Sequence, residues 1–293
     1  MVYAARMGHL DGKVVIVTGG GRGIGRAHAL RLAEEGCAVV VDDTGGSFRG
    51  EGVDPSVAAA VADEIAKKGG RAIACAHDVT RDADALVAEA VAAFGKVDGL
   101  ITSAAVFADG PLLELENERW LKTLDVNLRG TFACMQAVAK HLVGRGAPGR
   151  ILTTTSLAGL RGTPGLISYS AAKAGIYGLT LTAAQELRAH GITVNTLSPL
   201  AYTRVTAEPL KDVPNGEEIL APHFVADVAV FLLSDLASEI TGTVVEVQGA
   251  QVWISRLSST TPTHPEGARW SVEELSRRWS EISATTRSPS TGR

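Results

Sequence analysis

Val14-Val15-Ile16-Val17-Thr18 is an apolar, mostly β-branched run that leads directly into Gly19-Gly20-Gly21-Arg22-Gly23-Ile24-Gly25 and then into a segment of helical period. A run of this kind favours a buried strand, and glycine tolerates the tight turn between a strand and the start of a helix. Short apolar runs alternate with alanine-rich helical segments along most of the chain. This alternation predicts βαβ units around a parallel sheet.

The predicted elements define one α/β domain with a tail at each end. Strands are expected at residues 14–18, 38–42, 71–76, 99–102, 150–154, 193–197 and 243–247, and helices at 25–35, 56–68, 83–94, 117–143, 168–190 and 225–233. We therefore predict a single-domain, doubly wound (Rossmann) parallel sheet of seven strands over residues 11–252. Residues 1–10 form an N-terminal arm in this prediction. Residues 253–293 form a C-terminal extension with one short helix near 271–282 and a disordered last ten residues.

Composition and charge exclude several classes of function. The 293 residues carry 28 Lys and Arg against 32 Asp and Glu, a net charge of −4, with no basic block that would suit nucleic acid. No apolar run is long enough to span a membrane. Cys37, Cys75 and Cys134 are far apart and odd in number, which favours reduced thiols and a cytoplasmic protein. Neither an HxxxH nor a CxxC spacing occurs, so no metal site is expected.

The glycine-rich turn and the end of the next strand indicate a dinucleotide site. Backbone N–H groups at a helix start bind a pyrophosphate, and side chains on these glycines would block its approach. Asp42-Asp43 ends the second predicted strand, where a carboxylate can accept hydrogen bonds from ribose hydroxyls and repel a 2′-phosphate. This pattern favours NAD over NADP. The alternative is that the two aspartates only begin the turn continued by Thr44-Gly45-Gly46.

Tyr169 and Lys173 form the second chemical motif, with Ser156 upstream of them. Residues four apart share one face of a helix, and a cation beside a phenol lowers its pKa from about 10. Such a tyrosine could exchange a proton with an alcohol or a carbonyl near neutral pH. The alternative is an ordinary amphipathic helix with a partly exposed Tyr and a solvated Lys.

Taken together, these motifs make residues 11–252 resemble the short-chain dehydrogenase/reductase family. The match rests on the glycine spacing Gly19-xxx-Gly23-x-Gly25, on Asp78-Val79, and on Asn127, Ser156, Tyr169 and Lys173. The resemblance implies that the last four are catalytic, with Asn127 holding a water that relays protons. The cofactor-binding residues it implies are Gly19, Arg22, Gly23, Ile24, Gly25, Asp43, Asp78, Val79, Ser103, Ala104, Tyr169, Lys173, Pro199 and Thr203.

Two further segments, 41–50 and 199–206, look like the 3-hydroxyacyl-CoA dehydrogenase domain of peroxisomal multifunctional enzyme type 2. This likeness implies an NAD-dependent oxidoreductase that transfers a hydride between a secondary alcohol and the nicotinamide, and a homodimer or homotetramer. Two alternatives remain: an NADPH-dependent 3-oxoacyl reductase and a non-catalytic dinucleotide-binding scaffold.

The chain also departs from the family pattern. Thr102-Ser103-Ala104-Ala105 replaces the usual Asn-Asn-Ala-Gly, and we expect the hydroxyls to substitute in part for the lost amides. Leu200 stands near the expected nicotinamide position, where glycine is common.

Overall fold

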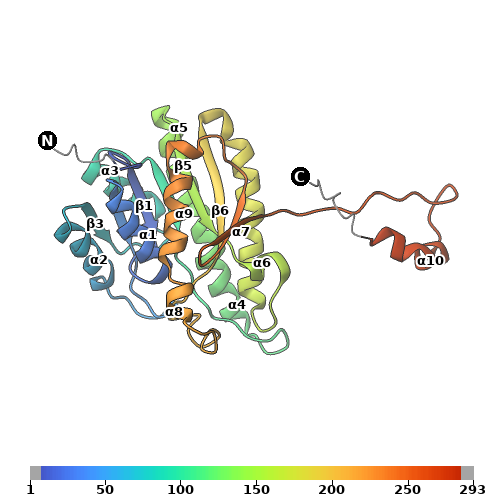
Figure 1. Cartoon of the computed structure of the whole chain (residues 1–293). Coiled ribbons are helices and arrows are strands. Elements are labelled where there is room, and N and C mark those ends of the chain that lie inside the picture. The colour runs from blue at the N-terminus through green and yellow to red at the C-terminus, as the bar shows by residue number, and fades with distance from the viewer. Residues whose placement is uncertain (1–7, 285–293) are drawn as a thin grey trace. The chain divides into compact units, whose positions relative to one another are not determined.

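A computed structural model describes residues 8–284 of the chain, which divides into two compact units, Met1–Ile254 and Ser255–Arg293. The first unit contains the sheet and its flanking helices (Figure 1). The predicted end of the domain at residue 252 falls inside the last strand. Within the described residues, no helix is both long and apolar enough to cross a membrane.

The sheet has eight strands rather than the predicted seven, in the order β3-β2-β1-β4-β5-β6-β7-β8. Neighbours from β3 to β7 run parallel. The order reverses between β1 and β4, where an α/β sheet forms its ligand crevice. The strands are β1 (Val14–Thr18), β2 (Ala38–Asp42), β3 (Arg71–Cys75), β4 (Gly99–Thr102), β5 (Gly149–Thr154), β6 (Ile192–Leu200), β7 (Val244–Gln248) and β8 (Gln251–Ser255).

The additional strand, β8, follows β7 after a two-residue turn at Gly249-Ala250. Gly249 has a positive φ of 53°, as the tight turns of hairpins require. Sequence analysis missed β8 because most of its side chains are exposed, so it lacks the buried apolar pattern of the other strands.

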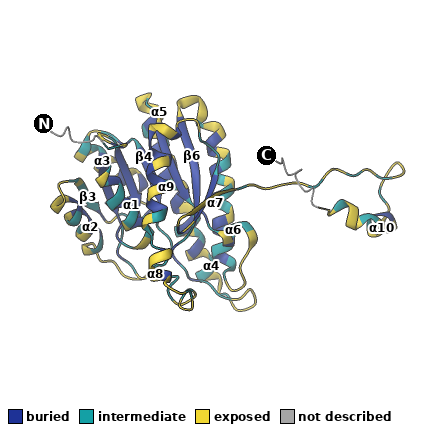
Figure 2. Cartoon of the chain, viewed as in Figure 1, coloured by how far each residue is buried: buried dark blue, intermediate teal, exposed yellow. Residues whose placement is uncertain are grey.

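Helices cover both faces of the sheet (Figures 1 and 2). Alternate residues of each central strand belong to two hydrophobic cores, one on each face. Val15 and Val17 of β1 pack with α1, α2 and α9, whereas Val14 and Ile16 pack with α3, α5 and α7. The helices on the first face are α1 (Gly23–Glu34), α2 (Ser56–Lys67) and α9 (His223–Leu233), and those on the second are α3 (Ala83–Phe94), α5 (Gly130–Arg145) and α7 (Ile167–Glu186). This alternation follows from the period of two along a strand, whose successive side chains point to opposite faces of the sheet.

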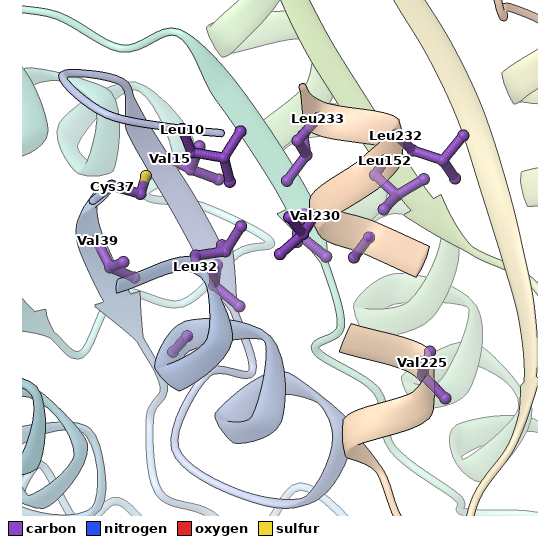
Figure 3. Close-up of a cluster of buried hydrophobic side chains, with 14 of the residues drawn as sticks. Leu10, Val15, Leu32, Cys37, Val39, Leu152, Val225, Val230, Leu232 and Leu233 are labelled. Atoms are coloured by element: carbon purple, nitrogen blue, oxygen red, sulfur yellow. The ribbon is translucent and has the colours of Figure 1, made fainter. Parts of the chain in front are cut away.

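Three details differ from the predicted elements. The helix expected at 117–143 consists of α4 (Asn117–Leu124), a π-helical turn η1 (Asp125–Arg129) and α5. Leu10, predicted to lie in the N-terminal arm, is fully buried in the first core (Figure 3). The short helices α6 (Leu157–Arg161), η2 (Arg188–His190), α8 (Gly216–Ile219) and η3 (Asp235–Ala237) were not predicted as separate elements, because segments this short carry little periodic signal.

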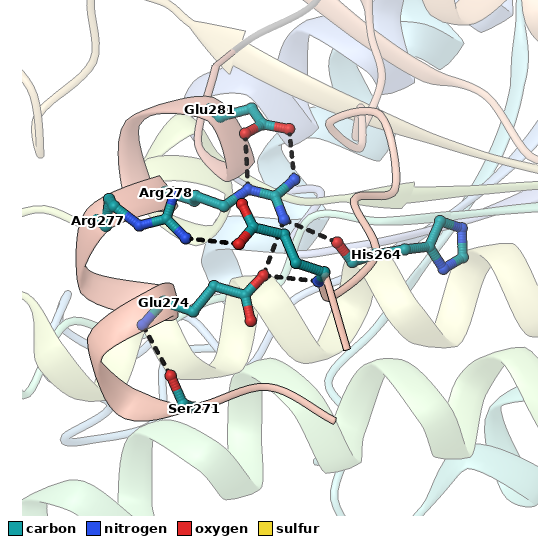
Figure 4. A network of polar contacts seen from close by, with 7 residues as sticks. His264, Ser271, Glu274, Arg277, Arg278 and Glu281 are labelled. Carbon is teal, nitrogen blue, oxygen red and sulfur yellow. Dashed lines mark hydrogen bonds and ion pairs between the residues drawn. The ribbon is translucent and has the colours of Figure 1, made fainter. Parts of the chain in front are cut away.

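The second unit contains α10 (Val272–Ile282), which confirms the helix predicted near 271–282. The Ser271 hydroxyl caps the helix by accepting a hydrogen bond from the Glu274 N–H. Arg278 pairs with Glu274 and Glu281 and also donates to the His264 carbonyl (Figure 4). The predicted disorder of the last ten residues concerns positions that, from 285 onward, lie outside the described residues.

Candidate active site

The carboxyl ends of β1, β2, β4 and β6 open into a cleft of about 590 Å³. That volume is typical of a site for a small molecule or cofactor. The cleft is lined by every residue that the family resemblance assigned to cofactor binding: Gly19, Arg22, Gly23, Ile24, Gly25, Asp43, Asp78, Val79, Ser103, Ala104, Tyr169, Lys173, Pro199 and Thr203.

The glycine loop between β1 and α1 packs tightly against the protein's own backbone. Gly19 has a φ of 66°, and a Cβ there would lie 2.6 Å from the Ala104 nitrogen. A Cβ on Gly25 would lie 2.0 Å from the Gly19 carbonyl oxygen. The loop precedes the first turn of α1, whose free N–H groups favour an anion. The backbone therefore fits the predicted pyrophosphate position.

Asp43 lines the cleft and also braces two loops. Its Oδ2 accepts a hydrogen bond from the Gly21 N–H at 3.0 Å, and its Oδ1 accepts one from the Gly45 N–H at 2.7 Å. A carboxylate has about four acceptor positions, so further hydrogen bonds from a ligand remain possible. The turn interpretation and the ligand interpretation of Asp43 are therefore compatible.

Asp42 differs from its neighbour because it is 1% exposed. Its Oδ1 accepts a hydrogen bond from the His77 N–H at 2.9 Å. Burial raises the pKa of Asp42 to about 7, although the bond from His77 opposes this shift. Asp42 thus stabilises the cleft from within the sheet through its hydrogen bond to His77. Asp43 is the more exposed of the two carboxylates, and its remaining acceptor positions could bind a ligand.

Tyr169 lines the cleft beyond the end of β5, and Ser156 lies next to it without lining the cleft itself. Ser156 caps α6, where its Oγ accepts a hydrogen bond from the Ala158 N–H at 3.2 Å, and it lies close enough to the Tyr169 hydroxyl to lower that group's pKa. The Tyr169 ring stacks on Phe107 with 4.4 Å between the ring centroids. Asp109 accepts hydrogen bonds from the N–H groups of Ser168 and Tyr169, at 3.0 and 2.7 Å. The start of α7, and with it Tyr169, is therefore fixed by the loop after β4.

The predicted lowering of the Tyr169 pKa is wrong for this structure. Although part of the residue is exposed, burial of its hydroxyl raises the pKa to about 12, while the Ser156 hydrogen bond acts in the opposite direction and the Asp109 charge adds to the rise. Desolvation outweighs the favourable contacts. Tyr169 is therefore protonated near neutral pH, the state that donates a proton.

Lys173 lies close to the tyrosine but does not dominate its ionisation. Its Nζ is 5.4 Å from the Tyr169 ring centroid and donates a hydrogen bond to the Thr154 carbonyl at 2.7 Å. Burial lowers the pKa of Lys173 to about 8. The structure thus confirms that the two side chains share one face of the helix, with the ammonium held by β5.

Asn127 is fully buried in the π-helical turn η1. Its side-chain amide accepts from the Val106 N–H at 2.8 Å and donates to the Val106 carbonyl at 2.9 Å, while its own carbonyl accepts from the Thr131 hydroxyl. This side chain holds the segment after β4 against the helix. The relay role implied by the family resemblance stays a prediction.

The departures from the family pattern have unequal effects. The buried hydroxyls of Thr102 and Ser103 have no hydrogen-bond partner in the described structure. The expectation that they substitute for the lost amides is therefore wrong, and the Ser103 hydroxyl stays available beside the cleft. Leu200 pairs with Gln248 at the end of β6, and the residues that line the cleft are its neighbours Pro199 and Ala201.

Sequence reasoning missed Phe107 and Asp109, which support the tyrosine, and Lys122, which lines the cleft. They lie outside the recognisable motifs. For Phe107 and Asp109 the clearest signal was proximity in sequence to the altered stretch that ends at Ala105, and Lys122 had no such signal.

Comparisons with known proteins agree with this geometry. The short chain dehydrogenase family model matches residues 13–212. Hydroxyacyl-CoA dehydrogenase ChsB1 of Mycobacterium tuberculosis is 37% identical over 297 residues, covering 97% of this chain and 90% of that protein. Peroxisomal multifunctional enzyme type 2 of Drosophila melanogaster is 37% identical over 247 residues, or 84% of this chain. The match spans only 40% of that longer relative.

Among solved structures, a short chain dehydrogenase from Mycobacterium avium superposes with a TM-score of 0.83 and 38% identity, covering 94% of this chain and 96% of that one. The chain belongs to the short-chain dehydrogenase/reductase family and is an oxidoreductase of that family. The family binds a nicotinamide dinucleotide and acts on hydroxyl or keto groups.

Proposed function

We propose that the chain is an NAD-dependent oxidoreductase that interconverts a secondary alcohol and a ketone. One observation carries the proposal: Ser156 lies close enough to the Tyr169 hydroxyl to influence its pKa, Lys173 lies beside the same ring, and Asp43 lines the same cleft as Tyr169 and Lys173. The small-molecule substrate is a hydroxyacyl thioester such as 3-hydroxyacyl-CoA, in keeping with the name of the mycobacterial relative. Steroid-like alcohols are a second group to test. We propose a cytoplasmic homodimer or homotetramer.

The chain's own residues would hold the cofactor along the cleft. The glycine loop binds the pyrophosphate, Asp43 the adenosine ribose, and Asp78 and Val79 the adenine. Lys173 binds the nicotinamide ribose, and Ser103, Pro199 and Thr203 complete the nicotinamide end. Bound NAD supplies the hydride acceptor, and its reduced form supplies the donor.

Proton transfer belongs to Tyr169. In reduction, the protonated phenol donates its proton to the oxygen that was the ketone oxygen, and in oxidation the phenolate removes the hydroxyl proton. Ser156 orients that oxygen and stabilises its developing charge by donating a hydrogen bond. Lys173 places a positive charge near the ring and favours the phenolate during turnover. Asn127 would connect Lys173 to solvent through water.

The NADPH-dependent 3-oxoacyl reductase is the second candidate, and one observation favours it. Arg204, Arg22 and Asp43 all line the cleft. The pKa of Arg204 is lowered chiefly by burial and further by the nearby charge of Arg22, so the two guanidinium groups lie close together. Two guanidinium groups could bind a 2′-phosphate. Against this candidate, Arg22 donates to the carbonyls of Gly45 and Gly46, and the Asp43 carboxylate repels a phosphate.

Turnover of hydroxyacyl thioesters and other secondary alcohols with NAD and with NADP, followed by nicotinamide absorbance, tests the proposal. We expect kcat/KM to be at least about tenfold higher with NAD, because two like charges placed together cost more than about 1.4 kcal/mol. Preference for NADP would favour the reductase. Dinucleotide binding without turnover on any member of the panel would favour the non-catalytic scaffold.

A further inference from the structure

Three metal-ligating side chains converge outside the proposed catalytic machinery. Cys75 ends β3, His77 follows two residues later, and Glu89 lies on α3. The cysteine sulfur, one imidazole nitrogen and one carboxylate oxygen all lie within 4.8 Å of one another. We propose that Cys75, His77 and Glu89 form a binding site for a zinc ion.

The three side chains offer the right chemistry for this ion. Zinc is bound by cysteine thiolate, imidazole nitrogen and carboxylate oxygen, and a site with three protein ligands takes water as the fourth. The mixture of soft sulfur with nitrogen argues against calcium or magnesium, which prefer oxygen ligands. On binding, the Cys75 thiol releases its proton to solvent and the thiolate forms the bond to zinc.

Only a small movement would be needed to admit the ion. His77 Nε2 and Glu89 Oε2 are 2.8 Å apart, a hydrogen-bonding distance. Bonds of about 2.0 to 2.3 Å in a tetrahedral site place ligand atoms roughly 3.3 to 3.8 Å apart. The Glu89 side chain is 48% exposed, so it can swing outward by this amount and leave a route from solvent.

Among the described residues, no lysine or arginine forms an ion pair with the cluster. In the described part of the chain, Glu89 forms an ion pair only with His77 and none with a lysine or arginine. Asp42, opposite Cys75 in the strand register, adds a buried carboxyl group. A cation therefore completes a cluster that otherwise contains only acidic groups and an imidazole.

Motif spacing did not reveal this site, and the sequence alone predicted no metal. Cys75 and His77 have a C-x-H spacing, and the third ligand comes from α3, across one helix–strand contact. The fold brings the two parts together. Because His77 also lines the cleft, an ion bound here would link the segment after β3 to α3 beside the cleft.

Cobalt titration of the full-length, chelator-treated protein tests the site without any activity measurement. Co²⁺ replaces zinc in such sites, and a thiolate ligand gives a near-ultraviolet charge-transfer band. We expect one equivalent of Co²⁺ with this band and its displacement by Zn²⁺. Cys75→Ser should abolish the band. His77→Ala and Glu89→Gln should each weaken Zn²⁺ binding more than tenfold.

Matched variants separate ligand loss from general damage. Cys37→Ser removes a buried thiol just before β2, at the end of that strand far from Asp42, the partner of Cys75, and Asp84→Asn removes a carboxylate elsewhere on α3; both should bind Co²⁺ as the unmodified chain does. If Cys75→Ser misfolds, the His77→Ala variant, whose side chain is partly exposed, carries the test. Absence of a thiolate band, or a band that persists in both Cys75→Ser and His77→Ala, would overturn the proposal.

Discussion

The two ends of the cleft are built in different ways. At the end proposed to hold the cofactor, the cleft is lined by the glycine loop and by Asp43, whose hydrogen-bond partners are Gly21 and Gly45. At the catalytic end, Tyr169 depends on side chains from other segments: Ser156, Phe107 and Asp109, the last 60 residues away in sequence. The cofactor end is therefore sensitive to backbone geometry, and the catalytic end to individual side chains.

Among the variants, Tyr169→Phe should have the largest effect. It should lower turnover and leave dinucleotide binding nearly unchanged. Removing the hydroxyl that exchanges the proton should lower kcat by about a thousandfold, within the range for loss of a general acid or base. Dinucleotide affinity, measured by fluorescence of the reduced nicotinamide, should change little. Tyr177→Phe on the same helix is the matched control and should retain activity. Full turnover in Tyr169→Phe would remove the basis of the proposed chemistry.

Gly19→Ala tests the cofactor end. Its Cβ would collide with the backbone of Ala104, and its φ of 66° is strained for alanine. We expect dinucleotide affinity to fall roughly ten- to a hundredfold, equivalent to about 1.4 to 2.7 kcal/mol. Gly12→Ala is the control, because Gly12 has a similar φ of 71° but nothing within 4 Å of its Cβ position. Equal losses of affinity in both variants would show that strain, rather than crowding at the cleft, causes the effect.

His28 offers a test by pH in α1, the helix that begins at the glycine loop. It is fully buried, neither ring nitrogen has a partner in the described structure, and burial lowers its pKa to about 3. Below pH 6.5 the unfolded chain binds a proton that the folded chain does not, so this residue's contribution to stability falls as pH decreases toward 3. From pH 7 to pH 5 the loss is about 2 kcal/mol.

His28→Phe should remove this contribution, which denaturant unfolding at both pH values would measure. The exposed His190, changed to Gln, is the control and should leave the pH dependence unchanged. Asp42, whose pKa burial raises to about 7, changes stability in the opposite direction, so only the difference between variants is interpreted. An identical pH dependence in His28→Phe and the unmodified chain would contradict the prediction.

Asp109→Ala should have the smallest effect on activity and stability. Its effect should arise because Asp109 holds Tyr169 in position. The Asp109 carboxylate caps the N–H groups of Ser168 and Tyr169, and loss of such a cap costs about 1 kcal/mol. We expect the free energy of unfolding to fall by that amount and kcat to fall severalfold, with dinucleotide affinity unchanged. Asp109→Asn keeps one acceptor oxygen and should lose less in both measurements. A loss of dinucleotide affinity with unchanged kcat would contradict the prediction, because it would show that Asp109 supports the cofactor end of the cleft rather than Tyr169.

The same contrast explains what the sequence could predict. The glycine loop, Asp43, and the Tyr169 and Lys173 pair were predictable because their geometry depends on neighbours along one strand or helix. Phe107 and Asp109 were not, since their partners come from a distant helix. The sign of the Tyr169 pKa shift was wrong because sequence spacing places a cation nearby but gives no measure of desolvation. The eighth strand was missed because its side chains are mostly exposed and leave no buried apolar pattern in the sequence.

The double bracing by Asp43 has a consequence for engineering. A substitution there that aims to change the preferred nicotinamide also removes the acceptor that holds Gly21 and the one that holds Gly45. Redesign of this position therefore requires new hydrogen-bond acceptors for the N–H groups of Gly21 and Gly45. Without them, a change in cofactor preference would be accompanied by a less ordered glycine loop.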